Sequence, residues 1–363
     1  MTPDMGIDPL GRDASGVDVP GAPAIPGLRF RHYAGPADHR EMDRVCNLAR
    51  RADGDPEVST VEALDVDYAH LINCDPARDV LLAEVDGMLV AYGRALWEDM
   101  NDSIRGYQSF GFVDPAWRRQ GIGWAMHRWF EARNVAIAAD HDVDRPRALI
   151  SWGYDENAGN VALLQRSGYA VDRRFLQMVR PTLEAIDVAP LPDGLEVRPG
   201  SMDHGRVVFE ADAEAFRDHW GAVHTSDDAF ETWRDQPATD PSLWVIAWDG
   251  DQVAGGVLGL ISAEENEAYG YRRGWLDSVF VRRPWRQRGL AKALIGRTLE
   301  RLRDRGMTSA QLGVDVDNVN RALDLYTGTG FAVVRTESAW RKPWPGPVAV
   351  PDGESALTDR RLR

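Results

Sequence analysis

Runs of hydrophobic residues separated by short polar turns predict a strand hairpin in each half of the chain. In the first half, apolar stretches cover Val80–Val85 and Met88–Tyr92, with the pair Asp86-Gly87 between them. An Asp-Gly pair between two such runs is a strong signal for a tight hairpin turn. The second half repeats the pattern, with Leu243–Trp248 and Gln252–Val257 on either side of Asp249-Gly250.

Apolar residues at helical spacing follow a glycine-containing segment in each half. Positions three or four apart lie on one face of a helix, so both sets predict an amphipathic helix. The two sets are Ile122, Met126 and Phe130 in the first half and Ala291, Ile295, Leu299 and Leu302 in the second half.

The two halves are copies of one unit. The segment Trp117-Arg118-Arg119-Gln120-Gly121-Ile122-Gly123 corresponds to Trp285-Arg286-Gln287-Arg288-Gly289-Leu290-Ala291, and the hairpins and the pairs Gly168-Tyr169 and Gly330-Phe331 correspond as well. Matching segments lie 162 to 168 residues apart, and the spacing changes only at predicted loops. We therefore predict two domains, at residues 28–181 and 195–343, joined by a linker at 182–194 and flanked by disordered tails at 1–27 and 344–363.

Each copy predicts an α/β fold of the α+β type. The predicted order within a copy is a strand, helices, a hairpin, a third strand, the glycine turn, a helix, a strand and a last helix. Such an order builds a mixed sheet with helices on both faces.

Composition and charge remove several classes of function. The chain of 363 residues has 42 Lys plus Arg and 57 Asp plus Glu, a net charge of −15. Such an acidic chain is a poor partner for nucleic acid. No apolar run approaches the roughly 20 residues of a membrane span, and the N-terminus lacks the features of a signal peptide, so we expect a cytoplasmic protein.

The counts of cysteine and lysine add further exclusions. Cys46 and Cys74 cannot form a disulfide framework, and no set of metal ligands gathers around them, so we expect no metal. The two lysines, Lys292 and Lys342, do not follow glycines, which excludes a P-loop NTPase.

The glycine turn between a strand and a helix is the strongest candidate for chemistry. Small residues let the backbone approach a ligand, and the free N–H groups of the helix N-terminus suit an anion such as a pyrophosphate. A plain strand–helix turn is the simpler interpretation. A Rossmann unit would require a third glycine where Met126 and Leu294 stand.

The glycine turn and a later segment together resemble the GNAT family of acyl-CoA-dependent N-acetyltransferases. The second copy carries Val281-Arg282-Arg283-Pro284-Trp285-Arg286-Gln287-Arg288-Gly289-Leu290-Ala291 and, later, Asn320-Arg321-Ala322-Leu323-Asp324-Leu325-Tyr326-Thr327-Gly328-Thr329-Gly330-Phe331. The tandem layout is similar to that of mycothiol synthase-like double-GNAT proteins.

The resemblance implies acetyl-CoA as cosubstrate and a set of residues that bind it. The turn at 286–291 would hold the pyrophosphate, and the strand Leu276–Val281, with Phe280 and Val281, would pair with the pantetheine arm. The implied cofactor-binding residues are Phe280, Val281, Arg286, Gln287, Arg288, Gly289, Leu290, Ala291 and Asn320, with Arg118, Arg119, Gln120, Gly121 and Gly123 as a second set in the first copy.

Transfer of an acyl group from a thioester to an amine needs a base for the amine and an acid for the leaving thiolate. The resemblance gives these roles to Asp277, four residues before Val281, and Tyr326, four residues before Gly330. A charge on a half-exposed strand and a core aromatic are the alternative interpretations. The first copy has Ser109 and Leu164 at these places, so we expect catalysis in the second copy and a degenerate first copy.

The region before the second hairpin supplies candidates for the acceptor site. Asp218 and His219 could hold a cationic acceptor, although a solvated helix end is the alternative. We expect an N-acetyltransferase that acts on a primary amine of a small molecule by direct attack in a ternary complex. A non-catalytic acyl-CoA sensor or scaffold is the competing hypothesis. Two copies that pack as a pseudo-dimeric pair predict a monomeric chain without nucleic-acid or membrane partners.

Overall fold

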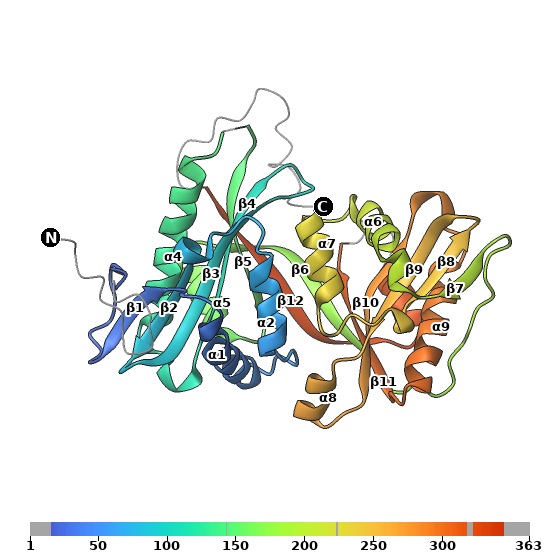
Figure 1. Cartoon of the computed structure of the whole chain (residues 1–363), viewed down its shortest axis with the longest axis horizontal. Coiled ribbons are helices and arrows are strands. Elements are labelled where there is room, and N and C mark those ends of the chain that lie inside the picture. The colour runs from blue at the N-terminus through green and yellow to red at the C-terminus, as the bar shows by residue number, and fades with distance from the viewer. Residues whose placement is uncertain (1–15, 143, 223, 318–321, 345–363) are drawn as a thin grey trace, which may run out of the picture.

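A computed structural model describes residues 16–142, 144–222, 224–317 and 322–344. Their strands form one continuous twelve-stranded mixed sheet with the order β1-β2-β3-β4-β5-β12-β6-β11-β10-β9-β8-β7, and helices cover it (Figure 1). The predicted α/β class with a mixed sheet is therefore confirmed.

The first copy forms one half of the sheet. Its hairpin β2–β3 turns at Asp86-Gly87, as the hydrophobic pattern predicts, and Ile122, Met126 and Phe130 are buried on α4. Its elements are β1 (Leu28–His32), α1 (His39–Ala52), α2 (Val61–Ala69), α3 (Pro76–Asp79), β2 (Val80–Val85), β3 (Met88–Asp99), β4 (Arg105–Val113), α4 (Ile122–Ala139), β5 (Arg147–Tyr154), α5 (Ala158–Arg166) and β6 (Ala170–Arg180).

The second copy repeats this order in the other half. Its hairpin β8–β9 and the buried stripe of α9, with Ile295, Leu299 and Leu302, also confirm the prediction. Its elements are β7 (Glu196–Pro199), α6 (Gly205–Phe216), α7 (Asp227–Asp235), β8 (Val245–Asp249), β9 (Gln252–Leu260), α8 (Ala263–Tyr269), β10 (Arg273–Val281), α9 (Leu290–Asp304), β11 (Ser309–Asp315), α10 (Ala322–Gly328) and β12 (Ala332–Pro343).

The two copies exchange their last strands. β6 ends the first copy but pairs with β11 of the second, while β12 ends the second copy and pairs with β5 of the first. The two exchanged strands also pair with each other along most of their length, in the centre of the molecule (Figure 1). The sheet therefore continues through both copies, and side chains of both copies stand on one face at the junction.

The segment that precedes each copy is ordered and packs against the core of that copy. In the range expected to be a disordered tail, residues 16–27 are ordered: Val19 is buried and the Val17 N–H donates to the Phe30 carbonyl, 2.8 Å away. In the predicted linker, Leu183 is buried in the second core and Arg297 donates to the carbonyl of Ala189. Apolar residues placed among the prolines explain this order, because they can be buried against the core without regular secondary structure.

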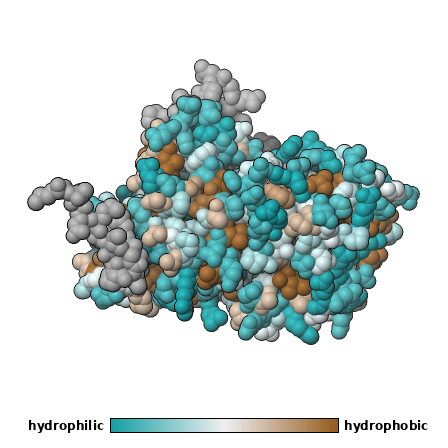
Figure 2. All heavy atoms as spheres, viewed as in Figure 1, coloured by the Kyte–Doolittle hydropathy of each residue, from teal (hydrophilic) through white to brown (hydrophobic). Residues whose placement is uncertain are grey.

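The outer surface carries mostly polar side chains. Figure 2 shows one face on which hydrophilic residues dominate and hydrophobic ones occur in small groups. Among the described residues, no helix combines the length and the apolar character that a membrane crossing requires.

Candidate active site

A gap between two strands of the second copy creates the main cavity. β10 and β11 run parallel and are paired from Arg273 with Ser309 to Trp275 with Gln311, and beyond that point the ladder ends. On its other side β10 stays paired with β9, apart from a register shift between Leu276 and Ser278. Such a bulge adds one unpaired residue and redirects its side chain, and here that residue is Asp277.

The cavity between the separated strands has a volume of about 710 Å³. It extends from the glycine turn to the exchanged strands, and its lining includes most of the second-copy residues that the sequence proposed for the cofactor. These are Phe280, Val281, Arg286, Gln287, Gly289, Leu290 and Ala291. A pantetheine arm has the length to follow such a gap, with unpaired backbone groups of β10 beside it.

Backbone geometry keeps the glycine turn open toward this cavity. Gly289 has φ +82° and nothing lies within 4 Å of the position that a Cβ would take, while Gln287 has φ +60°. The next residue begins α9, whose first N–H groups have no partners within the helix. The turn therefore presents a helix N-terminus without side-chain obstruction, as an anion site requires.

The side chain of Arg286 supports the turn from behind. Its Nε donates to the Val281 carbonyl at 2.9 Å, and one Nη donates to the Ala215 carbonyl at 3.0 Å. Arg118 makes the equivalent bonds to Val113 and Ala49 in the first copy. In both copies the arginine thus ties the turn to the end of a strand and to a helix.

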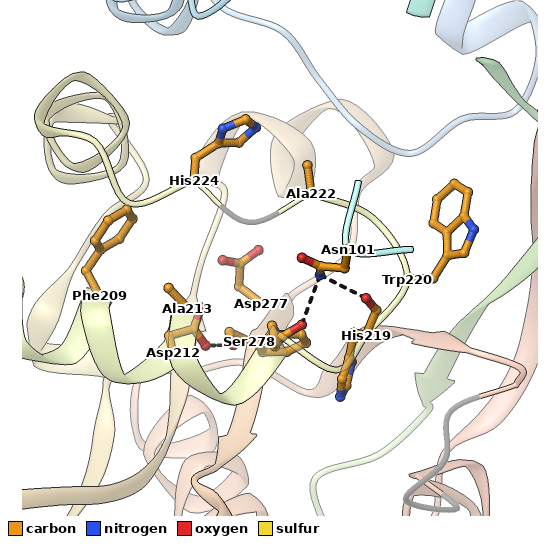
Figure 3. Close-up of a pocket in the computed structure, with 11 residues that line it drawn as sticks. Asn101, Phe209, Asp212, Ala213, His219, Trp220, Ala222, His224, Asp277 and Ser278 are labelled. Carbon is orange, nitrogen blue, oxygen red and sulfur yellow. Dashed lines mark hydrogen bonds between the residues drawn. The ribbon is translucent and has the colours of Figure 1, made fainter. Parts of the chain in front are cut away.

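A second cavity, of about 360 Å³, adjoins the first at Asp277. Asp277, Phe216, His219 and Trp220 line both cavities. Figure 3 shows the Asp277 carboxylate directed toward the middle of the smaller cavity. This arrangement suits a site where an acceptor in one cavity meets a cofactor in the other.

Asp277 is exposed to solvent through the cavity, although many protein atoms surround its carboxyl. Burial, together with the charge of Glu57, raises the pKa of its carboxyl. Among the described residues, none donates a hydrogen bond to this carboxylate. A carboxylate whose pKa is raised is a better proton acceptor, because its basicity comes closer to that of an amine.

Asp212 on α6 forms a second carboxyl group beside Asp277. The Ser278 hydroxyl donates to it (Figure 3). Burial raises its pKa to about 7, and the charge of Asp277 acts in the same direction, against the hydrogen bond from Ser278.

Tyr326 on α10 is 6% exposed and lines the larger cavity. Burial raises the pKa of its phenol to about 12, so the hydroxyl carries its proton at neutral pH. Asp277 and Tyr326, proposed from the sequence as base and acid, thus line the same cavity.

Two described candidates of the second copy lie outside the cavity lining. Arg288 donates to the carbonyl of Asp193, and Asp218 forms an ion pair with Arg283 on the surface. This pairing leaves the Asp218 carboxylate neutralised and outside both cavities, in contrast to its neighbour His219. Asn320 lies outside the described residues.

The corresponding strands of the first copy stay together for longer. Its β4–β5 ladder continues to Gln108 with Ile150, and the next residues are bridged because the Ser151 hydroxyl donates to the carbonyl of Ser109. Leu164, at the place of Tyr326, is fully buried. Its turn residues, Arg118, Arg119, Gln120, Gly121 and Gly123, line neither of the two cavities described above.

A possible metal site lies elsewhere. In the described part of the chain, His70, Asp228 and Glu231 bring potential ligand atoms within 4.8 Å of one another at the surface between α2 and α7. None of the three lines either cavity.

Residues of the first copy complete the site of the second, and the sequence did not indicate them. Asn101, at the tip of the β3–β4 hairpin, donates to the carbonyls of Phe216 and His219 and lines the smaller cavity (Figure 3). Trp152 and Phe175 line the larger cavity.

The sequence does carry a signal for Asp212 of the second copy. It is a charged residue on the face of α6 that also carries the buried residues Val208, Ala211 and Ala215.

Comparison with known proteins agrees with this geometry. The sequence model of the acetyltransferase (GNAT) family matches the chain twice, at residues 42–169 and 207–331. The chain belongs to the GNAT acetyltransferase family. It is a tandem member and an N-acetyltransferase, which decides against the non-catalytic sensor.

Individual relatives match most of the chain. A mycothiol acetyltransferase of Salinispora tropica is 30% identical over 309 residues, covering 80% of this chain and 94% of the relative. One from Geodermatophilus obscurus is 27% identical over 344 residues and covers 93% and 99%. A solved GCN5-related N-acetyltransferase from Sphaerobacter thermophilus is 27% identical, with a TM-score of 0.65 and coverage of 88% and 97%.

Proposed function

We propose that this GNAT enzyme transfers the acetyl group of acetyl-CoA to a primary amine of a small molecule, at a single site in the second copy. The observation that carries the proposal is the position of Asp277. It lies where the two cavities meet, and the larger cavity also contains the open glycine turn and Tyr326.

In the proposed complex, acetyl-CoA occupies the larger cavity. The N–H groups of the turn at 286–291 bind the pyrophosphate, and the unpaired edge of β10 follows the pantetheine arm. The acceptor occupies the smaller cavity, with its amine next to Asp277. The longer strand pairing in the first copy, with Ser109 and Leu164 at the places of Asp277 and Tyr326, supports a structural role for that copy.

The reaction follows from these positions. Asp277 takes a proton from the acceptor ammonium, directly or through one water, and the neutral nitrogen attacks the thioester carbon. The C–N bond forms as the C–S bond breaks, and Tyr326 gives its proton to the departing thiolate. The nitrogen then loses its second proton, which returns through water to the Tyr326 oxygen, and Asp277 releases the first proton to solvent as the amide leaves. No covalent enzyme intermediate is required.

Activity measured with a panel of amines can identify the chemical class of the acceptor. Relatives are named mycothiol acetyltransferase, so the amine precursor of mycothiol belongs in the panel. Simple alkylamines and diamines provide the comparison, because they differ in charge with little change in shape.

The variants Asp277→Asn and Tyr326→Phe test the proposal. Loss of a general base or acid lowers kcat by about 10²- to 10⁴-fold, while the affinity for acetyl-CoA stays within about twofold. Stopped assays for free thiol give kcat, and calorimetry gives the affinity. Arg128→Gln, an exposed change on α4 of the first copy, serves as a control that leaves both unchanged. Wild-type kcat in the double variant would refute the assignment of these residues.

A further inference from the structure

Three aromatic rings from both copies form one apolar wall of the larger cavity. Trp152 on β5 and Phe175 on β6 belong to the first copy, and Trp220 to the second. Their ring centroids lie 5.3 to 5.7 Å apart, so the three rings are in mutual contact. We call them the aromatic wall.

A carboxylate stands directly beside the aromatic wall. Glu337 on β12 is the cross-strand neighbour of Phe175, so strand exchange alone brings the two together on one face. Glu337 lines the same cavity and is partly buried. Within the described part of the chain, no group donates a hydrogen bond to its carboxylate.

Two acidic and two basic side chains act on the charge of Glu337, and the two acidic ones are themselves paired with Arg50. Asp55 and Glu57 act on it from the loop after α1, against Arg335 on its own strand and Arg50 on α1. Arg335 is engaged elsewhere, since it donates to the carbonyls of Gly54 and Asp53. Tyr154 faces Glu337 from β5, while Asp315, across Phe175, is neutralised by Arg173.

Ring faces and a carboxylate without a hydrogen-bonding partner together favour an organic cation. The face of an aromatic ring attracts a cation, and the carboxylate can accept its N–H groups. An apolar acyl chain is disfavoured here, because it would bury the Glu337 carboxylate without a partner.

We propose that the aromatic wall and Glu337 bind a second ammonium group of the acceptor, so that the preferred substrates are diamines or related compounds with two cationic nitrogens. This inference rests on the proposed function. One nitrogen reacts beside Asp277, where the two cavities meet. The other extends past Asp277 into the end of the larger cavity at the exchanged strands, while acetyl-CoA occupies the other end of that cavity, at the glycine turn.

A series of matched acceptors tests the inference. Unbranched diamines of three to six carbons are compared with the monoamine and the amino alcohol of equal length, by kcat/KM at saturating acetyl-CoA and pH 8. We expect the best diamine to exceed its monoamine and amino alcohol by about tenfold, or about 1.4 kcal/mol. Calorimetric binding of the diamine to the enzyme should show the same order without turnover.

Glu337→Gln should reduce the ratio of kcat/KM for the diamine to kcat/KM for the monoamine to about one. Phe175→Leu should reduce this ratio several-fold. Glu156→Gln is the matched control, because Glu156 also contacts Arg335 but lies outside the cavity lining, and it should leave the ratio unchanged.

A pH series gives an independent readout. Burial, and then Glu57 and Asp55, raise the pKa of Glu337 to about 7. A second alkylammonium keeps its proton throughout this range. In the wild type, the ratio of kcat/KM for the diamine to that for the monoamine should therefore fall as the pH decreases from 8 to 6. Protonation of Asp277 and of the reacting amine affects both substrates in the same way, so these effects cancel in the ratio.

The outcomes separate the two proposals. No acetylation of any amine would refute the proposed function. Acetylation with a ratio near one, a ratio that survives Glu337→Gln, or a preference for the amino alcohol would each overturn the second-ammonium site and leave the proposed function standing.

Discussion

At the scale of single residues, the site depends on carboxyl groups placed where burial alters their chemistry. Asp277 lies on a bulge, which turns its side chain toward the acceptor cavity. Asp212 lies on α6, and its carboxylate accepts a hydrogen bond from the hydroxyl of Ser278, the residue next to Asp277. Burial raises the pKa of both carboxyls.

Asp212 should reduce stability at high pH. Its pKa is raised to about 7 in the folded protein, against 3.8 as the ordinary value. As the pH rises through this interval, the unfolded chain loses the proton first, so the folded state loses stability. Asp212→Asn keeps a hydrogen-bonding side chain without this cost. It should raise Tm by roughly 2–4 °C at pH 8, with a smaller change at pH 4.

The control for this measurement is Asp218→Asn. Asp218 has a pKa lowered by its hydrogen bond and ion pair with Arg283, so its replacement should not raise Tm at pH 8. Scanning calorimetry at both pH values measures the effect. An unchanged Tm of Asp212→Asn at pH 8 would show that Asp212 does not carry a buried charge.

At the scale of elements, the repeated turn shows how one local structure serves two purposes. Gly121 and Gly289 have φ +96° and +82°, and the residues two positions earlier, Arg119 and Gln287, are left-handed as well. In the second copy the turn opens into a cavity, because β10 and β11 separate in front of it. In the first copy the strands stay bridged by Ser151.

The matched arginines behind the two turns provide an experiment that the repeat makes possible. Arg286→Ala and Arg118→Ala each remove a side chain that donates hydrogen bonds to two backbone carbonyls. Each variant should lower the free energy of unfolding by about 1–3 kcal/mol. Arg286→Ala should also weaken acetyl-CoA binding by about tenfold, because the turn at 286–291 loses its fixed geometry.

Arg118→Ala should leave the acetyl-CoA affinity unchanged. Urea titration and calorimetry on both variants make the comparison. Equal losses of affinity would mean that the two turns contribute equally to cofactor binding, contrary to the proposed single site.

At the scale of the whole molecule, strand exchange makes each copy depend on the other. β12 carries Glu337 into the cavity and carries Lys342 against the first copy, where its Nζ lies 2.8 Å from Glu131 of α4. The Glu131 side chain is 12% exposed and that of Lys342 is 25% exposed, so the pair is partly shielded from water. The last strand of the chain is thereby fixed to its first half.

Lys342→Met should destabilise the molecule by about 1–2 kcal/mol, a value reduced from that of a fully buried pair because of the remaining exposure. Burial alone would raise the pKa of Glu131, but the neighbouring His127 and Lys342 lower it to about 2, against 4.5 ordinarily. The stabilisation is therefore present above pH 4.5 and is lost as the pH falls toward 2.

Urea unfolding of wild type and Lys342→Met at pH 7 and pH 3 tests this dependence. The difference between the two proteins should be smaller at pH 3. Lys292→Met is the control, because Lys292 pairs with the exposed Asp187 and does not connect the copies. A difference that is the same at both pH values would exclude the ion pair as its source.

The sequence by itself determined the features that are local or repeated. The hairpins follow from turn pairs between apolar runs, the stripes of α4 and α9 follow from helical spacing, and the duplicated order predicts two units of one family. The residues of the glycine turn, Asp277 and Tyr326 were found because each belongs to a motif of fixed spacing.

Only the tertiary structure decided which strands pair and what they bring together. An exchanged strand has the same sequence pattern as a strand that stays in its own copy, since either partner buries the same faces. Asn101, Trp152, Phe175 and Glu337 therefore gave no signal, because their proximity to Asp277 depends on contacts between distant parts of the chain. Local motifs therefore identified the residues proposed for the reaction. The shape of the proposed acceptor site depends on how the two copies share one sheet.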